Sequence, residues 1–451
     1  MKRLIAICFL ISMGLHAMES VPKSEYRERR MKLGQSLNGG AAVLFAANAA
    51  VLDFMPYRQD SDFYYLTGWN EPGAALVIVG AGPETVLPRL GTPVPTHPYR
   101  EILFLPERNL VLEKYTGAKL DSANVDAAAK VGVEKVMPIS AMPGVLASFA
   151  AEDRRRLQHL WWQNDFEAAN AAMRFVAASM GTDQMPPAHD VRSLILPLRS
   201  VKSAAEIDLL RKASNASIQA QFAGMRAIRP GVTERTIAGI EIAESMKQGC
   251  ERESYAAIVG AGANSVTLHY SSNEATIAQG DVVLIDAACE YSMYASDITR
   301  TMAATRKFTP RQRELYEIVL GAQKAAAAAF VAGKTRLGNV NERGAGVTDS
   351  LDKVAYDYIN THGKDLHGEP LGKYFLHGLG HSVGIDVHDP YDPAKALDRG
   401  NVFTIEPGIY LPEEKIGIRI EDVVYVDNEG KLVDLIATLP HEASEIEAAM
   451  R

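Results

Sequence analysis

Two aspartates in the second half of the chain, Asp286 and Asp297, have a spacing that suits ligands carried on a β-hairpin. The apolar run Val282–Ile285 predicts a short buried strand that ends at Asp286. Residues 291–299 include tyrosines and a threonine and predict a return strand. Such a hairpin would bring the two carboxylates side by side, where they repel each other and are costly to bury. A bound metal ion is the expected source of compensating positive charge.

Three further candidate ligands follow at long range. His381 lies in the segment HGLGHSVGIDVHD, and Glu406 and Glu421 lie in apolar runs, where an ionised glutamate is unexpected. The complete set of four carboxylates and one imidazole favours Mn²⁺, Mg²⁺ or Ca²⁺, and the single histidine also admits Co²⁺, Zn²⁺ or Fe²⁺. Because four carboxylates exceed what one divalent ion needs, the set predicts two metal ions bridged by shared carboxylates and a water.

The motifs that carry these residues resemble those of the pita-bread-fold metallopeptidases, and most closely those of the aminopeptidase P (Xaa-Pro aminopeptidase) family. In the second half of the chain they are HGLGHSVGIDVHD, FTIEPGIY and GIRIEDVVYV. In the first half, PYRQDSDFYYLTGWNEPGAALVIVG (residues 56–80) resembles the signature of the family's amino-terminal domain. The resemblance runs from about Tyr26 to Glu447, with the motifs in the family's order and spacing.

The resemblance assigns a role to each candidate metal ligand. Asp286 would bind one ion through both of its oxygens, while Asp297 and Glu421 would bridge the two ions. His381 and Glu406 would complete the coordination of the second ion. The expected cofactors are two divalent ions, with Mn²⁺ favoured and Co²⁺, Zn²⁺ or Fe²⁺ as alternatives.

The resemblance also implies a reaction, the release of the first residue from peptides that have proline in second position. A hydroxide that bridges the two metals would attack the scissile carbonyl. His269 and His388 would contact the substrate and stabilise the tetrahedral intermediate. Glu406 would carry the proton to the leaving proline nitrogen.

Three more residues are expected to bind the substrate. In the family pattern, His377 lines the pocket for the proline side, and Arg419 forms hydrogen bonds near the bridging ligands. Arg419 precedes Glu421 by two residues, so on a strand both side chains face the same side. Tyr410 is expected to act in a similar way to Arg419. Since proline lacks an N–H, the pocket must recognise the shape of its ring.

The expected fold class is α/β (α+β) with two domains. Residues 24–180 would form a smaller, creatinase/aminopeptidase P-like α/β domain, and residues 181–195 would form a linker. Residues 196–447 would form the pita-bread catalytic domain, built on a curved antiparallel sheet. Near its start, Ser203 and Glu206 have the spacing of a capping box and predict the beginning of a helix.

The first residues have the layout of a secretory signal peptide. Lys2 and Arg3 precede the apolar run 4–15, which is short for a membrane span. We expect removal of residues 1–17 and an exported protein, either periplasmic or secreted. An uncleaved amino-terminal anchor is the alternative.

Charge and cysteine content restrict the partners and the chemistry. The formal net charge of −8 argues against a nucleic-acid partner. Cys250 and Cys289 would remain after removal of the leader, and Cys289 is expected to be a small buried residue, with no disulfide and no thiolate chemistry. A homo-oligomer, dimer or tetramer, is expected by analogy with the family.

Other activities on the same fold are alternatives. A prolidase would cleave Xaa-Pro dipeptides, but the amino-terminal motif favours aminopeptidase P. Methionine aminopeptidase is disfavoured by the substantial amino-terminal domain, and creatinase by the metal-ligand set. A non-catalytic binding protein is the alternative from a different class, and the intact set of five candidate ligands argues against it.

Overall fold

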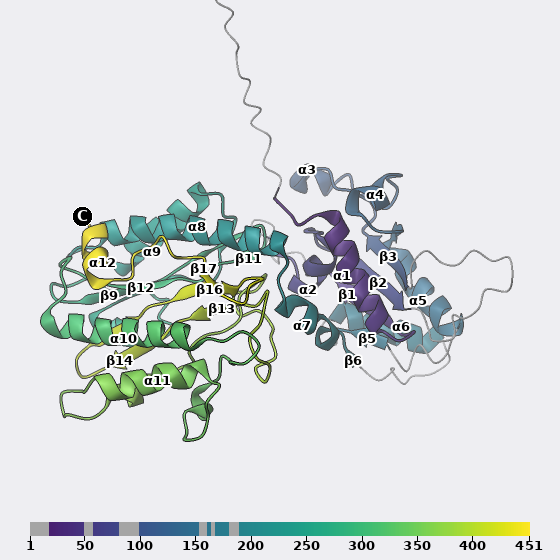
Figure 1. The fold of residues 1–451 in the computed structure, drawn as a ribbon. Helices are drawn as coiled ribbons and strands as arrows, with labels where there is room; N and C mark the ends of the chain where they lie inside the picture. Colours follow the sequence, from purple (N-terminus) through teal and green to yellow (C-terminus); the bar gives the residue numbers. More distant parts are fainter. Residues whose placement is uncertain (1–17, 49–56, 81–98, 153–159, 164–166, 180–188) are drawn as a thin grey trace, which may run out of the picture.

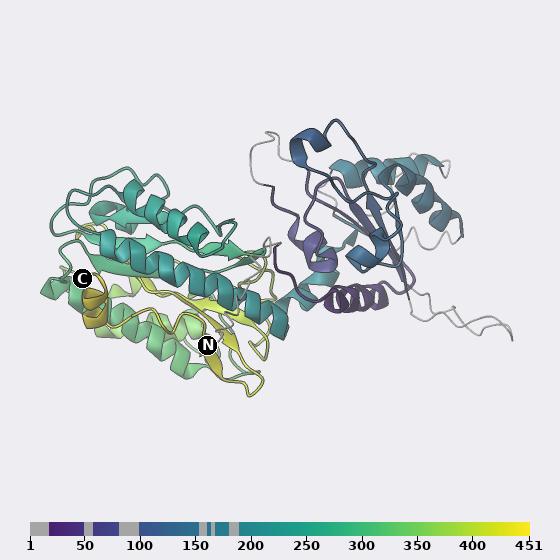
Figure 2. The same ribbon diagram turned by 90° about the horizontal axis from the view of Figure 1, so that it is seen from above.

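The computed structural model describes residues 18–48, 57–80, 99–152, 160–163, 167–179 and 189–451. These residues form two bodies of unequal size, which lie side by side in both ribbon views (Figures 1 and 2). The chain passes from the smaller body to the larger one through α7 (Arg192–Ser200) and α8 (Ala204–Ala227). Ser203 and Glu206 form the predicted capping box at the start of α8. The mixed α/β class with a smaller amino-terminal domain is confirmed.

A six-stranded mixed sheet in the order β4-β3-β2-β1-β5-β6 organises the amino-terminal body. Its strands are β1 (Ala41–Phe45), β2 (Ala75–Gly80), β3 (Tyr99–Leu105), β4 (Val136–Pro138), β5 (Leu160–Trp162) and β6 (His189–Asp190). Its helices are α1 (Lys23–Ser36), α2 (Ser61–Thr67), α3 (Glu113–Thr116), α4 (Ala127–Val131), α5 (Met142–Glu152) and α6 (Glu167–Ser179), with the short 3₁₀ helix η1 (Ile139–Ala141).

Side chains alternate between the two faces of this sheet and bury both of them. Leu44 and Leu76 share one hydrophobic cluster with Leu33 of α1 and with residues of α2. Val43 and Val77 share the other with residues of α5 and α6. Helices therefore cover both faces, and α2 is placed next to the larger body.

The carboxy-terminal body is built from four small antiparallel sheets, in the orders β12-β9-β8, β13-β16-β17, β14-β15 and β11-β10-β7. The strands are β7 (Arg252–Glu253), β8 (Ile258–Ala261), β9 (Val282–Asp286), β10 (Cys289–Tyr291), β11 (Tyr294–Ala295), β12 (Thr299–Ala303), β13 (Val402–Ile405), β14 (Gly408–Leu411), β15 (Ile416–Arg419), β16 (Asp422–Val426) and β17 (Leu432–Asp434). An isolated bridge between Thr299 and Glu421 joins two of these sheets. The predicted antiparallel pairing is thus present, divided among small sheets.

Two pairs of helices enclose these strands. The helices after α8 are α9 (Glu234–Lys247), α10 (Pro310–Ala329), α11 (Leu351–His362) and α12 (Ala443–Ala449), and the 3₁₀ helices are η3 (Gly262–Val266), η4 (Val340–Glu342) and η5 (Leu371–Tyr374). In Figure 1, α8 and α9 run along one side of the strands and α10 and α11 along the other. Polar residues at the strand ends are therefore held between two helical layers.

The two cysteines form a disulfide, so the prediction of no disulfide was wrong. Cys250 and Cys289 are joined across a Cα–Cα distance of 6.0 Å, and Cys289 is fully buried, as predicted. The bond ties the turn after α9 to β10, and Cys289 lies three residues beyond Asp286. Spacing alone could not reveal the pair, because the two residues meet only when β10 pairs with β7.

The predicted leader, residues 1–17, lies outside the described residues. The predicted linker, residues 181–195, is described only from residue 189, where β6 is followed by the start of α7. Among the described residues, no helix combines the length and the apolar character that a membrane span requires.

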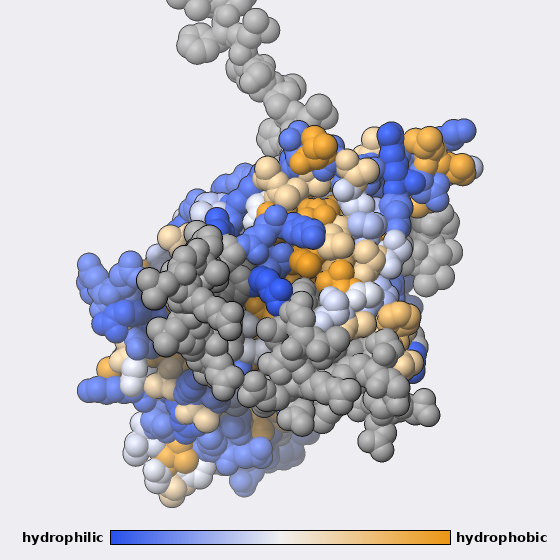
Figure 3. Space-filling model, turned by 90° about the vertical axis from the view of Figure 1, so that its right-hand side faces the viewer, coloured by the Kyte–Doolittle hydropathy of each residue, from blue (hydrophilic) through white to orange (hydrophobic). Residues whose placement is uncertain are grey.

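The amino-terminal body carries several exposed large hydrophobic residues. Leu110, Val111 and Leu112 precede α3, and Tyr115 lies within it and is 81% exposed. Figure 3 shows this end of the molecule, where hydrophobic and hydrophilic residues are interspersed over the surface.

Candidate active site

The predicted pair of aspartates is brought together by β9 and β12. Asp286 ends β9, and its partner in the antiparallel register is Thr299, two residues after Asp297. The Tyr255 hydroxyl lies 2.6 Å from Oδ1 of each aspartate. The two carboxylates therefore share one hydroxyl donor and lie side by side, as the hairpin pattern predicted.

The return strand differs from the prediction because it is broken. β10 and β11 form a tight hairpin of their own, with Ser292 and Met293 at its turn, both with positive φ (52° and 72°). Turns of this kind usually contain glycine or asparagine, and neither stands at these two positions, so the turn could not be predicted from the residues. As a result Asp297 lies in the link between β11 and β12 rather than in a strand.

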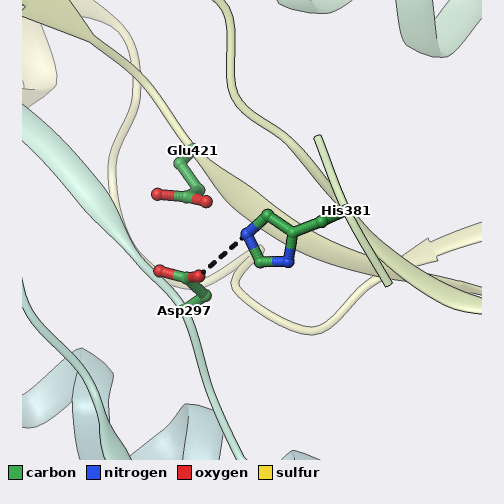
Figure 4. Close-up of side chains that lie close together, drawn as sticks. All are labelled: Asp297, His381 and Glu421. Atoms are coloured by element: carbon green, nitrogen blue, oxygen red, sulfur yellow. Dashed lines mark ion pairs between the residues drawn. The ribbon is translucent and has the colours of Figure 1, made fainter. Parts of the chain in front are cut away.

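Three other predicted ligands lie close to the aspartates. Asp297, His381 and Glu421 each offer a ligand atom within 4.8 Å of the other two, and their side chains point toward one another in Figure 4. His381 Nε2 lies 3.3 Å from Asp297 Oδ2 and 3.4 Å from Oε1 of Glu406. All five predicted ligands thus belong to one contact network, formed by the ends of β9, β13 and β15, the link between β11 and β12 and the loop that carries His381.

Two threonines that the sequence did not single out hold the glutamates. Thr299 donates a hydrogen bond from Oγ1 to Glu421 Oε2 at 2.6 Å. Thr404 donates from Oγ1 to Glu406 Oε1 at 3.1 Å. Tyr255 plays the equivalent part for the aspartates. Thr404 lies in FTIEPGIY, two residues before Glu406, and this spacing could have indicated the contact, whereas Tyr255 lies outside the quoted motifs.

The electrostatics of the cluster are those of an acidic site that requires a cation. Burial raises the pKa of Glu406 to about 7 and raises the pKa of Glu421 well above its usual range, with the negative charge of Asp297 adding to both. Burial also raises the pKa of Asp286, although Arg419 opposes this. Burial lowers the pKa of His381, but the hydrogen bond to Asp297 and the charge of Glu406 raise it to about 9.

The donor set fits divalent metal ions. Buried carboxylates with raised pKa values indicate uncompensated negative charge, and a divalent ion would remove it. Carboxylate oxygens with one imidazole are ligands that Mn²⁺ and similar ions accept. The residues that would hold the ions are Asp286, Asp297, His381, Glu406 and Glu421.

Arg419 begins a chain of hydrogen bonds that leads away from the cluster. Its guanidinium donates from Nη2 to Asp286 Oδ2 and from Nη1 to the Tyr410 hydroxyl at 2.8 Å. His377 Nε2 lies 2.8 Å from that hydroxyl, and Nδ1 lies 2.8 Å from the Gly378 carbonyl oxygen. The consistent assignment is that Nδ1 donates to the carbonyl and that Tyr410 donates to Nε2.

His377 is therefore a neutral imidazole with both nitrogens engaged. Burial, reinforced by the positive charge of Arg419, lowers its pKa to about 3. Its ring can act as an apolar wall at neutral pH, because no charge and no free nitrogen remain.

One cavity of about 570 Å³ receives most of these side chains. It is lined by nine of the ten predicted site residues: His269, Asp286, Asp297, His377, His381, His388, Glu406, Arg419 and Glu421. Tyr410 does not line it and acts through Arg419 and His377. Ile258, Leu268 and Val387 contribute apolar surface.

The two remaining histidines lie where the cavity is open to solvent. His269 follows η3 and is exposed, as is His388 in the loop after His381. The rings of His388 and His381 have their centroids 3.9 Å apart. A substrate bound in the cavity would thus meet carboxylates on its inner side and imidazoles at its mouth.

Comparisons with known proteins agree with this geometry. Residues 208–428 match Metallopeptidase family M24, and residues 26–158 match the aminopeptidase P N-terminal domain. The sequence is 33% identical to Xaa-Pro aminopeptidase of Escherichia coli strain K12, over 96% of this chain and 99% of that protein. It is 32% identical to Xaa-Pro aminopeptidase of Haemophilus influenzae, over 97% of this chain and 100% of that protein.

Solved structures of aminopeptidase P are also similar to this chain. Escherichia coli aminopeptidase P with the inhibitor Pro-Leu superposes with a TM-score of 0.80 at 30% identity, covering 96% of this chain and 99% of that one. The zinc-substituted form of that enzyme in complex with product gives a TM-score of 0.80 at 31% identity, with the same coverage. Both domains and the whole described fold are therefore shared, and the chain belongs to the aminopeptidase P branch of metallopeptidase family M24.

Proposed function

We propose that the protein is a metal-dependent aminopeptidase that releases the first residue of peptides with proline in second position. The observation that carries this proposal is the single cavity lined by nine of the predicted site residues, in a chain 33% identical to an Xaa-Pro aminopeptidase over nearly its whole length. The ends of β9, β13 and β15, the link between β11 and β12 and the loops that carry the histidines meet there, and strands can hold such side chains in a fixed geometry.

Two divalent ions, preferably Mn²⁺, are the proposed cofactors. Four carboxylates within one contact network support two ions, since a single ion leaves part of the negative charge uncompensated. When bound, such ions would supply Lewis-acid polarisation of a carbonyl group and a water acidic enough to ionise near neutral pH. Metal analysis of the purified protein would count and identify them.

The side chains of the chain supply the remaining steps. Glu406 lines the cavity beside His381, and in the proposed reaction it would carry a proton to the leaving proline nitrogen. His269 and His388, at the open side of the cavity, are placed to contact the substrate and to stabilise negative charge on the carbonyl oxygen. Hydrogen bonds from Tyr255, Thr299 and Thr404 keep the carboxylates in fixed orientations.

Selectivity for proline would come from His377. Tyr410 and the Gly378 carbonyl occupy both ring nitrogens, so the imidazole offers a neutral surface. A proline ring, which brings no N–H, fits such a surface better than a residue whose amide would be left without a partner.

The test is hydrolysis of an Xaa-Pro-Xaa tripeptide beside the matching Xaa-Pro dipeptide, with metal-stripped protein in the presence and absence of Mn²⁺. We expect release of the first residue from the tripeptide only, dependent on metal and lost in Asp297→Ala. Cleavage of the dipeptide instead would make the protein a prolidase. Metal binding without cleavage of either peptide would leave a non-catalytic binding protein.

We propose further that the protein is exported to the periplasm or the medium. Support comes from Lys2 and Arg3 followed by the apolar run 4–15, and from the Cys250–Cys289 disulfide, which suits an oxidising compartment. Fractionation with sequencing of the mature amino terminus checks this. A cytoplasmic protein with an intact leader would contradict it.

A homo-dimer or homo-tetramer is the proposed assembly, by analogy with the family alone. Light scattering coupled to size-exclusion chromatography measures the mass directly. A monomer at micromolar concentration would contradict the proposal.

A further inference from the structure

The loop that carries His388 lacks regular structure of its own. Residues 384–390 contain no helix and no strand. Val387 and His388 line the cavity, whereas Asp386 and Asp389, on either side of His388, turn their carboxylates toward α7. A segment without a ladder of backbone hydrogen bonds needs another source of order.

Arg199, near the end of α7, supplies that order. Its side chain is buried and donates from Nη2 to Asp386 Oδ2 at 2.7 Å and also to Asp389 Oδ1. From Nη1 it donates to Asp62 Oδ1 at 2.8 Å. A planar guanidinium fixes the directions of its partners, so the carboxylates at both sides of His388 are held by one rigid group.

The neighbouring Lys202 also binds this loop. Its ammonium donates to Asp389 Oδ2 at 2.9 Å and to Ser382 Oγ at 3.3 Å, and it is buried. Both oxygens of Asp389 are therefore engaged. Because Ser382 directly follows His381, the same contacts connect the His388 loop to a predicted metal ligand.

The amino-terminal body holds the same loop through residues at and just before the start of α2. Ser61 donates from Oγ to Asp386 Oδ1 at 2.6 Å, and Arg58 donates from Nη2 to the Ile385 carbonyl oxygen at 2.9 Å. Arg58 also donates from Nε to Glu290 Oε1 at 2.7 Å, next to Cys289 in β10. The two bodies therefore meet at the loop that presents His388.

We propose that Arg199 is a positioning residue that sets the place of His388 in the cavity by fixing Asp386 and Asp389, and so couples the amino-terminal domain to catalysis. This inference rests on the proposed function, in which His388 stabilises the reacting carbonyl. Arg199 itself does not line the cavity, so its effect on the reaction passes through the loop. A displacement of about 1 Å at a catalytic group can lower the rate about 10²-fold.

The test is a double-mutant cycle between Arg199 and His388, with kcat and KM measured for an Xaa-Pro-Xaa tripeptide in saturating Mn²⁺. We expect Arg199→Met to lower kcat between about 10-fold and about 10²-fold. In the His388→Ala background the same substitution should lower kcat less than about 2-fold, because the group that Arg199 positions is already absent. Arg199→Lys keeps the positive charge but loses the planar guanidinium with its several N–H donors. Its kcat should lie between those of wild type and Arg199→Met.

Arg30→Met is the matched control for loss of a buried ion pair. Arg30 is fully buried in the amino-terminal body, where it donates from Nε to Glu101 Oε2 at 2.6 Å and to backbone carbonyls. This substitution should lower the melting temperature as Arg199→Met does, and leave kcat within about 2-fold of wild type.

Hydrogen exchange gives a readout that does not depend on activity. Amides of residues 384–389 should exchange at least about 10-fold faster in Arg199→Met than in wild type, and Arg30→Met should leave them unchanged. Unaltered exchange in this segment, or equal loss of kcat in both His388 backgrounds, would overturn the inference. Should the wild type cleave no proline peptide, the proposed function fails, and the exchange data still decide whether Arg199 orders the loop.

Discussion

Two clusters of carboxylates among the described residues differ in how their negative charge is compensated. In one, Asp62, Asp386 and Asp389 contact Arg199 and Lys202. Arg199 and hydrogen-bond donors outweigh burial and lower the pKa of Asp386, whereas burial raises the pKa of Asp62 although Arg199 opposes this. In the other, four carboxylates line the cavity beside Arg419, and the pKa values of Asp286, Glu406 and Glu421 are raised.

The difference separates a structural cluster from a functional one. A cluster compensated by its own side chains is complete when the chain has folded. A cluster with excess negative charge stores unfavourable electrostatic free energy that a bound cation can release. The cavity cluster, with four carboxylates beside one arginine, therefore has negative charge that a bound divalent cation would compensate.

The largest expected effect is on activity in the cavity cluster. Asp297→Ala removes a residue that contacts His381 and shares the Tyr255 hydroxyl with Asp286, so we expect kcat/KM to fall by at least about 10³-fold. Steady-state kinetics with titrated Mn²⁺ measure this. Activity that recovers fully at high Mn²⁺ would show that Asp297 only tunes metal affinity.

The free energy of unfolding should respond differently to loss of a carboxylate in the two clusters. Asp389→Asn leaves Arg199 and Lys202 short of a buried counter-charge and should lower the free energy of unfolding by about 3 kcal/mol. Asp297→Asn in the metal-free protein relieves repulsion and should cause no loss. Urea denaturation of both variants with chelator present compares them, and an equal loss would remove the distinction between the clusters.

The pH dependence of stability should also differ in sign. Glu406 has a pKa of about 7 in the folded state against an ordinary value of 4.5, so the folded state holds its proton more tightly than the unfolded state. Glu406 should thus contribute a loss of about 3 kcal/mol to the stability of the metal-free protein as pH rises from about 4.5 to about 7. His381, with a pKa raised to about 9, continues the loss above pH 6.5, whereas Asp386 loses its contribution on acidification instead.

Urea denaturation across this pH range, with and without Mn²⁺, tests the sign. Glu406→Gln should flatten the part of the curve between pH 4.5 and 7, and Mn²⁺ should reverse the slope in the wild type, because metal binding competes with protons. A metal-free protein that gains stability over this range would contradict the assignment of excess negative charge.

The smallest effect is expected at Tyr255, whose hydroxyl is shared by Asp286 and Asp297. Tyr255→Phe keeps the ring and removes that donor, and should weaken Mn²⁺ binding about 10-fold. Isothermal titration calorimetry measures the change. Phe308→Leu, a core substitution away from the cavity, is the control and should leave Mn²⁺ affinity unchanged.

Sequence patterns anticipated the cavity cluster but not the compensated one. Glu406 and Glu421 stood out because ionised residues interrupt apolar runs, and Asp286 because it ends a strand pattern. The contacts of Arg199 could not be anticipated, since Asp62, Asp386 and Asp389 meet it only after the two bodies dock. The shared donor Tyr255 and the Cys250–Cys289 pair were missed for the same reason. Their partners lie far away in the sequence, and no fixed spacing relates them before the chain folds.

The redox state of Cys250 and Cys289 should affect how the chain binds metal ions. Cys289 lies between Asp286 and Asp297 in sequence, so the bond to Cys250 anchors the segment that connects these two aspartates. Thiol reductants would break this disulfide, and they would also compete with the protein for metal ions. Protein made under oxidising conditions and protein made under reducing conditions would then have the same sequence. They would differ in the conformational order of Asp286 and Asp297 in the metal-free state.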